Sequence, residues 1–149
     1  MSEPLLSTHG LKAFYGDFQA LFGVDFEIGS GEVVALIGAN GAGKSTFLKS
    51  VMGAIKVGAD MVKLQGKPSG GLPPHLMVSN GVAIVPEGRR LFAGMSVEDN
   101  LRVAIDHKAG GSDTWTLDRI YKLFPILKDK RRDPVQSLSG GQQQMVSIG

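Results

Sequence analysis

The sequence predicts an α/β fold in which a glycine-rich loop joins a buried strand to a helix. Residues 32–38, EVVALIG, form a continuous, largely β-branched apolar run, which is typical of a strand buried on both faces. The glycine-rich loop follows at once, and KSTFLKSVMGAI then places apolar residues at helical spacing. LFGVDFEI, residues 21–28, alternates roughly between apolar and polar positions, as in a half-buried antiparallel strand. We therefore expect a mixed sheet.

Two further segments predict strands. MVKLQG, residues 61–66, alternates over a short stretch and ends at a glycine. GVAIV, residues 81–85, is a second continuous apolar run, and Pro86 ends it. The first is expected to be half-buried and the second to be buried on both faces.

Residues 89–138 are predicted to be mostly helical. Ser96, with Asp99 three positions later, predicts a capping box that opens a helix extending to about Ala104. TWTLDRIYKLF, residues 114–124, predicts another helix, which Pro125 stops.

The composition bounds the function without identifying it. The 149 residues suit one domain, and a net charge of +2 is too small to indicate a nucleic-acid partner. The sequence has no cysteine, which excludes disulfides, thiolate metal sites and cysteine nucleophiles. The longest apolar run is residues 33–37, and the N-terminus does not resemble a signal peptide. Any membrane role is therefore expected to come through a partner.

The loop after the first buried run matches the pattern G-x-x-x-x-G-K-[ST] at Gly38, Gly43, Lys44 and Ser45. A loop without side-chain bulk lets backbone N–H groups surround a polyphosphate, and the start of the next helix adds positive potential. Lys44 is expected to reach the terminal phosphates and Ser45 to ligate Mg²⁺. The alternative is a glycine-rich turn without function. The expected nucleotide-binding residues here are Gly38, Asn40, Gly41, Gly43, Lys44, Ser45 and Thr46.

A second motif distinguishes among the proteins that share this loop. LSGGQ, residues 138–142, resembles the signature sequence of ATP-binding cassette (ABC) ATPases. Ser139 and Gln142 have capping-box spacing, and the glycines between them leave the helix start open to an anion; a plain capped helix is the alternative. The resemblance implies that ATP and Mg²⁺ are the cofactors, and that two subunits pair head to tail around the nucleotide. It adds Ser139, Gly140, Gly141 and Gln142 to the expected nucleotide-binding residues.

The resemblance covers the whole chain and implies its architecture. It predicts a P-loop NTPase core with an N-terminal antiparallel β subdomain and an inserted helical subdomain. Residues 1–149 would then be a partial nucleotide-binding domain that lacks the family's C-terminal strands. Within it, residues 1–88 are expected to be the core with the β subdomain, residues 89–138 the helical subdomain, and residues 139–149 the start of the signature helix.

Two more residues are assigned through the resemblance. Tyr15, in KAFYG, matches the aromatic residue that stacks on adenine, although Phe14 or Phe18 could take that place and a core aromatic is the alternative. Glu87 stands where the family has a glutamine that contacts Mg²⁺ and the attacking water. We assign Glu87 to the metal and to the catalytic site, because a carboxylate can also hold Mg²⁺.

Four segments, PEGRRLF, SVEDNL, YKLFPILKDKRR and QSLSGGQQQM, are similar to ATP-binding subunits of branched-chain amino acid importers. This similarity implies an ATPase that drives amino-acid uptake from the cytoplasmic face of the cell membrane. The expected partners are a second ABC ATPase subunit, identical or different, and transmembrane permease subunits, with residues 89–101 near the permease contact. No nucleic-acid partner is expected.

The family's hydrolytic residues after the signature helix are an Asp for Mg²⁺, a catalytic Glu and a switch histidine. The sequence printed here ends at Gly149, and its histidines, His9, His75 and His107, all precede the signature. We therefore expect hydrolysis by the complete protein but not by this chain, and we expect the isolated chain to be unstable or to self-associate. The alternatives are a non-hydrolysing nucleotide-binding or interaction fragment, a non-transport ABC ATPase, and a P-loop kinase, which LSGGQ disfavours.

Overall fold

The computed structural model describes residues 3–106 and 115–149. The chain divides into two compact units, the N-terminal unit (Met1–Ile84) and the helical unit (Val85–Gly149), and each is described by itself. Among the helices of these described ranges, none is long and apolar enough to cross a membrane.

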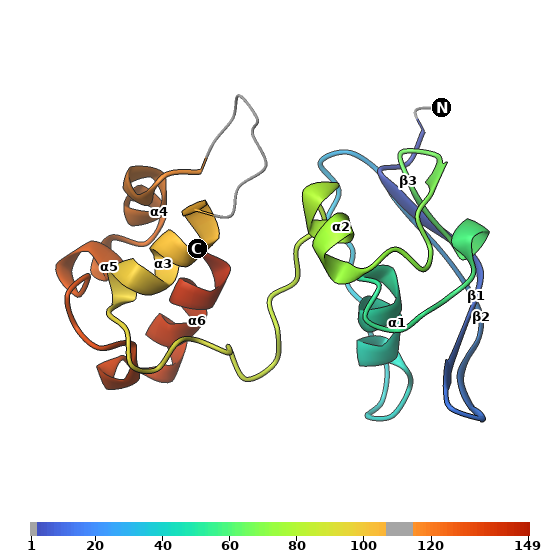
Figure 1. Ribbon diagram of the computed structural model, residues 1–149, viewed down its shortest axis with the longest axis horizontal. Coiled ribbons are helices and arrows are strands. Elements are labelled where there is room, and N and C mark those ends of the chain that lie inside the picture. The colour runs from blue at the N-terminus through green and yellow to red at the C-terminus, as the bar shows by residue number, and fades with distance from the viewer. Residues whose placement is uncertain (1–2, 107–114) are drawn as a thin grey trace. The chain divides into compact units, whose positions relative to one another are not determined.

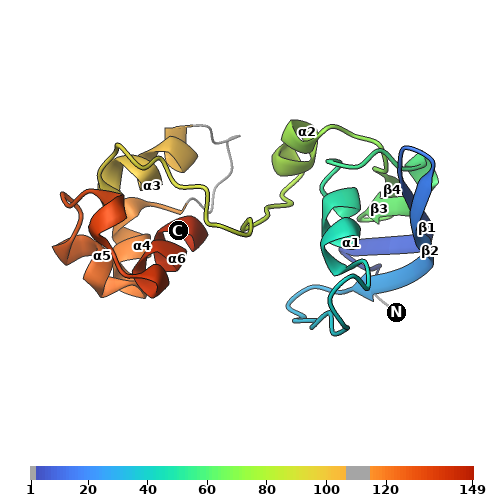
Figure 2. The same ribbon diagram turned by 90° about the horizontal axis from the view of Figure 1, so that it is seen from below.

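The N-terminal unit contains a four-stranded antiparallel sheet with the order β2-β1-β3-β4 (Figure 2). The long hairpin places Ala13 opposite Leu21, and β1 also pairs with β3. The predicted strands at residues 21–28 and 61–66 are both present, the second only over three residues. The strands are β1 (Leu6–Tyr15), β2 (Phe18–Ile28), β3 (Val62–Leu64) and β4 (Lys67–Pro68).

Helix α1 (Lys44–Val51) lies against this sheet, and their contact forms the core of the unit. Phe47 and Val51 are buried, and the Phe47 ring meets the edge of Phe26 with 5.2 Å between ring centroids. Met52, directly after the helix, is also buried, whereas 44% of Leu48 is exposed. The unit also contains the short helices η1 (Ala59–Met61) and α2 (Pro74–Ser79).

The prediction of two strands buried on both faces is wrong. Residues 32–38 and 81–85 belong to no strand, and Val33 and Ile37 are 98% and 93% exposed. A buried strand needs a hydrogen-bonded neighbour on each side, and no segment of the described chain pairs with either run. The apolar pattern therefore indicates that these residues suit a buried strand, but a strand also needs neighbouring strands to pair with.

The helical unit is a cluster of short helices around one apolar core (Figure 1). The core includes Val97, Leu101, Ile120, Leu127 and Val146. Its elements are α3 (Val97–Asp106), α4 (Leu117–Leu123), α5 (Pro125–Asp129), η2 (Val135–Ser137) and α6 (Gly140–Ile148).

The predicted capping box at Ser96 and the predicted stop before Pro125 are confirmed. The Asp99 amide donates to Ser96 Oγ at 3.1 Å, and this hydroxyl in turn donates to the Asp99 carboxylate at 2.6 Å. Thr116 caps α4, and α4 ends before Pro125, which opens α5. The predicted start of that helix at residue 114 lies outside the described residues.

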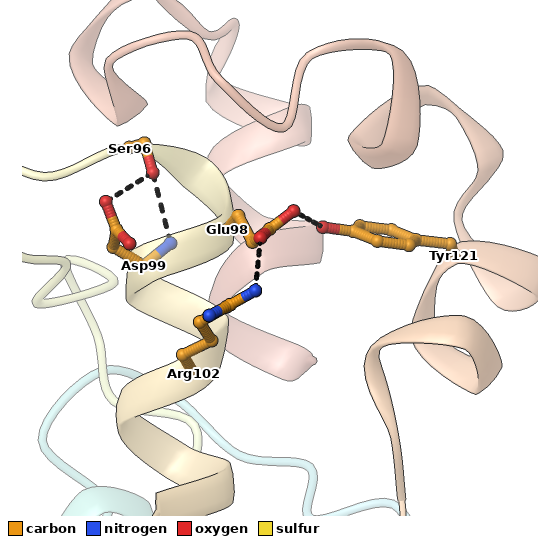
Figure 3. Close-up of polar contacts among 5 residues, drawn as sticks. All are labelled: Ser96, Glu98, Asp99, Arg102 and Tyr121. Carbon is orange, nitrogen blue, oxygen red and sulfur yellow. Dashed lines mark hydrogen bonds and ion pairs between the residues drawn. The ribbon is translucent and has the colours of Figure 1, made fainter.

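A buried tyrosine joins α4 to α3 through a carboxylate (Figure 3). Tyr121 Oη donates to Glu98 Oε2 at 3.1 Å, and Arg102 Nη2 lies 2.7 Å from Glu98 Oε1. Burial first, and then the hydrogen bond to Glu98, raises the pKa of Tyr121 to about 12 from its ordinary value of 10.0. The phenol therefore stays protonated well beyond the pH at which an unfolded tyrosine ionises.

This pKa shift predicts a loss of stability at alkaline pH. Because the folded state holds the Tyr121 proton more tightly than the unfolded state does, its contribution is complete below pH 10.0 and is lost as the pH rises toward about 12. Across that range the free energy of unfolding should fall by up to about 2 kcal/mol more in the wild type than in Tyr121→Phe. Denaturant titrations of both proteins at several pH values measure the difference, and parallel curves would contradict the assignment.

Candidate functional site

The loop before α1 is closed by its own lysine. Lys44 Nζ donates to the carbonyl oxygens of Gly38 and Ala39 at 2.6 and 2.7 Å. A turn inside the loop is closed by the Ala42 amide, which donates to the Ala39 carbonyl at 3.2 Å. The loop thus holds a positive charge at its own opening, before any ligand is bound.

Backbone conformation explains two of the loop glycines. Gly41 and Gly43 have φ angles of 87° and 92°, in the left-handed region that side chains disfavour. A Cβ atom at Gly43 would also lie 2.8 Å from Leu21 Cδ2, whereas one at Gly41 would meet nothing within 4 Å. Gly43 is the N-cap of α1 and brings no side chain over the start of the helix. The amide groups of the first turn are thus not screened by a capping side chain.

Tyr15, at the end of β1, is placed beside the same loop. Its Oη lies 3.4 Å from Thr46 Oγ1 in the first turn of α1, and 48% of the residue is exposed. Phe14 and Phe18 are also exposed, at 48% and 70%. The contact with Thr46 sets Tyr15 apart from these two phenylalanines and favours it as the residue beneath a purine base. That role stays a prediction.

The signature segment opens α6 in the helical unit with the predicted capping box. The Gln142 amide donates to Ser139 Oγ at 3.3 Å, and the Ser139 amide donates to Gln142 Oε1 at 3.0 Å. Gly140 and Gly141 bring no side chain to the first turn. The segment before this turn is held by Gln143, whose Nε2 donates to the carbonyls of Val135 and Leu138 at 3.2 Å each.

Glu87 belongs to the helical unit and begins a loop with unusual backbone angles. Gly88, Arg89 and Arg90 have φ angles of 76°, 61° and 48°. Arg89 Nη1 donates to Gln143 Oε1 at 2.9 Å, and Ser147 Oγ donates to the Arg89 carbonyl at 3.1 Å. From the sequence, Arg89 was expected only as part of the range 89–101 near the permease contact, and Gln143 had no expected role. These two residues are 54 positions apart, and no local spacing signals their contact.

The structure brings together some of the predicted site residues and separates others between the two units. Tyr15 and residues 38–46 form one group, whereas Glu87 and residues 139–142 belong to the other unit. Whether Ser45 and Glu87 share one Mg²⁺ therefore stays a prediction. No group of three or more His, Cys, Asp or Glu side chains in the described ranges could hold a metal ion. His9 and His75 are exposed, and His107 lies outside the described residues.

The N-terminal group fits a polyphosphate chemically. It combines a lysine ammonium, a bare helix start and two left-handed glycines within one loop. Backbone N–H groups and a lysine point charge are the groups that bind phosphate oxygens in such loops. The nearby hydroxyl of Ser45 and the exposed ring of Tyr15 suit a metal and a base, respectively.

Comparison with known proteins gives consistent matches. A family model described as ABC transporter matches residues 21–149. The high-affinity branched-chain amino acid transport ATP-binding protein BraG of Pseudomonas aeruginosa is 38% identical over 97% of this chain and 62% of its own length. The probable branched-chain amino acid transport ATP-binding protein LivF of Archaeoglobus fulgidus is 35% identical over 97% of this chain and 61% of its own. The fructose import ATP-binding protein FrcA of Rhizobium meliloti is 32% identical over 98% of this chain and 61% of its own length.

Solved structures show the same likeness. The structure of an ATP-binding subunit of an ABC transporter matches with a TM-score of 0.76 and 28% identity, over 97% of this chain and 60% of that one. The structure of cbiO1 from Clostridium perfringens, part of the ABC transporter complex cbiONQ, matches with a TM-score of 0.70 and 26% identity. The match covers 98% of this chain and 60% of that one. The chain thus spans about 60% of the length of these proteins.

The glycine geometry predicts unequal costs for two alanine substitutions in the loop. Gly41→Ala should lower the free energy of unfolding by about 1 kcal/mol, because the only penalty is the left-handed backbone. Gly43→Ala should lower it by about 2 to 4 kcal/mol, because the new methyl group also collides with Leu21 in the core. Chemical denaturation of both variants measures the difference. Equal losses would show that Leu21 moves aside freely.

Proposed function

This chain belongs to the ABC transporter family, and from that premise we propose that the complete protein is the ATP-binding subunit of an importer. The observation that supports this most directly is the loop around Lys44, whose ammonium group is held by the carbonyls of Gly38 and Ala39. A triphosphate offers the same ammonium group stronger acceptors, because its oxygens are charged and the carbonyl oxygens are neutral.

In this proposal each loop residue has a separate task. Lys44 moves from its two carbonyls to the terminal phosphates, and the backbone amides of residues 38–46 surround them. Ser45 is a candidate ligand for Mg²⁺, and Glu87 is another; a bound Mg²⁺ would neutralise phosphate charge. Tyr15 stacks on adenine, at a distance from the phosphates that its contact with Thr46 sets.

The signature residues act on a second nucleotide in this proposal. Ser139, Gly140, Gly141 and Gln142 form an open helix start that suits the terminal phosphate of ATP bound to another ABC subunit. The partners are therefore a second ABC ATPase subunit, of the same or another sequence, and transmembrane permease subunits. The protein would act at the cytoplasmic face of the cell membrane through those permeases.

We propose that the complete protein hydrolyses ATP, because the chain matches the ABC transporter family model and ATP-binding transport proteins. Phosphoryl transfer depends mainly on positioning and charge stabilisation. Within this chain, Lys44 and the loop amides would orient the terminal phosphate, and Glu87 is the candidate for holding Mg²⁺ or the attacking water. The further residues that hydrolysis needs are those that the family carries after the signature helix.

The substrate class is supported by the relatives alone. The two branched-chain amino acid transport proteins are 38% and 35% identical to this chain, and the fructose import protein is 32% identical. We therefore propose amino acids, with branched-chain amino acids first, and a sugar as the second candidate.

Removal of the Lys44 charge tests the proposal, with nucleotide affinity as the measurement. Lys44→Ala should weaken the binding of a fluorescent ATP analogue with Mg²⁺ by at least about tenfold, because it removes the ammonium group that meets the terminal phosphates. Lys49→Ala is the matched control, since Lys49 is an exposed lysine on the same helix and lies in its last turn. Fluorescence titration measures both affinities.

Three results would count against the proposal. The wild type could fail to saturate while circular dichroism still reports folded helices. The two lysine variants could lose affinity equally, which would indicate general electrostatic attraction in place of a built site. An unchanged affinity in Lys44→Ala would place the nucleotide elsewhere.

A further inference from the structure

We propose that Arg89 is a positioning residue that fixes the loop carrying Glu87 to the signature helix α6. The inference rests on contacts within the helical unit. Its functional meaning rests on the proposed role of Glu87 in binding Mg²⁺.

The attachment uses both the side chain and the backbone of Arg89. Its guanidinium donates to Gln143 Oε1 at 2.9 Å, and its carbonyl accepts from Ser147 Oγ at 3.1 Å. Gln143 and Ser147 lie one turn apart on α6 and face the same way. Gln143 is itself held by the carbonyls of Val135 and Leu138, so that the arginine meets a fixed acceptor.

The backbone of the loop requires such an attachment. Arg89 and Arg90 are non-glycine residues with φ angles of 61° and 48°, a conformation that L-residues disfavour. Consecutive residues persist in this region only where surrounding contacts hold them. Of the two arginines, Arg89 provides those contacts. The side chain of Arg90 makes no hydrogen bond or ion pair to any described residue.

Gly140 provides the space for the guanidinium. A Cβ atom at Gly140 would lie 3.0 Å from Arg89 Nη2, whereas one at the neighbouring Gly141 would meet nothing within 4 Å. The first signature glycine thus has a second task beside leaving the helix start open. Its missing side chain is where the arginine packs.

The C-terminal end of the loop, at Phe92, is fixed to helix α3. The Phe92 amide donates to Asn100 Oδ1 at 2.8 Å, and Asn100 Nδ2 donates back to the Phe92 carbonyl at 3.1 Å. Residues 86–92 are therefore tied to α3 at one end and to α6 in the middle. A displacement of the whole loop must then break the Arg89 contacts or move α6 with it.

Hydrogen–deuterium exchange on the full chain, without nucleotide, tests the attachment. Arg89→Gly relieves the left-handed strain but removes the side-chain contacts, and Arg90→Gly gives the same relief and the same charge change without losing a hydrogen bond. We expect peptides covering residues 86–92 and 139–144 to exchange at least about tenfold faster in Arg89→Gly and within about twofold of the wild type in Arg90→Gly. Arg89→Lys should recover part of the protection.

Equal protection in Arg89→Gly and the wild type would overturn the inference, because the backbone alone would then set the loop. If Arg89→Gly does not fold, Gln143→Ala decides the same question. Its control is Gln144→Ala, because Gln144 is of the same type, lies on α6 and has a side chain that makes no hydrogen bond to any described residue. Faster exchange of the loop peptide in Gln143→Ala alone supports the attachment, and equal exchange in both variants overturns it.

A second measurement connects the attachment to the metal. If Arg89 positions Glu87, Arg89→Gly should raise the Mg²⁺ concentration at half-maximal binding of the ATP analogue by at least about threefold, while Arg90→Gly leaves it unchanged. An equal midpoint in both variants overturns the link to Glu87. Failure of the wild type to bind the analogue at all counts against the proposed function, and the exchange experiment still decides the attachment.

Discussion

The contact between the Lys44 ammonium and the carbonyls of Gly38 and Ala39 is the interaction on which the candidate site depends. At 2.6 and 2.7 Å these are short, charge-assisted hydrogen bonds, and they hold the loop closed around its own cation. A phosphate that binds in this loop would take the ammonium group over from the two carbonyls, because its charged oxygens are stronger acceptors. The left-handed backbone at Gly43 makes this possible, because it turns the chain directly into α1.

The features predicted correctly from the sequence are those that short spacings encode. Ser96 with Asp99 and Ser139 with Gln142 each satisfy a helix start through residues three positions apart, and both capping contacts are present. In both cases the interacting groups are brought together by local backbone geometry, so that their order in the chain is enough to predict them. The phosphate role predicted for the lysine loop stays a prediction.

The features that were missed depend on distant partners. Residues 32–38 have the composition of a buried strand, but a strand also requires neighbours, and no described segment pairs with it. The contact of Arg89 with Gln143 spans 54 positions and depends on a left-handed arginine, which no propensity predicts. Glu87 could be assigned only by its place in a family pattern, because no local spacing in the sequence signals the metal role proposed for it.

The two candidate phosphate sites begin helices in opposite ways, and this difference bears on how each could act. Helix α1 starts at Gly43 without a side-chain cap, so that the loop amides and Lys44 define the site. Helix α6 starts with a complete capping box, in which Ser139 already occupies the Gln142 amide. An anion at α6 therefore meets a helix start that is stable beforehand, with the amides of two glycines ahead of the capped one. The first site is built to surround its ligand and the second to present a fixed surface to it, and a fixed surface is what Arg89 and Gln143 help to maintain.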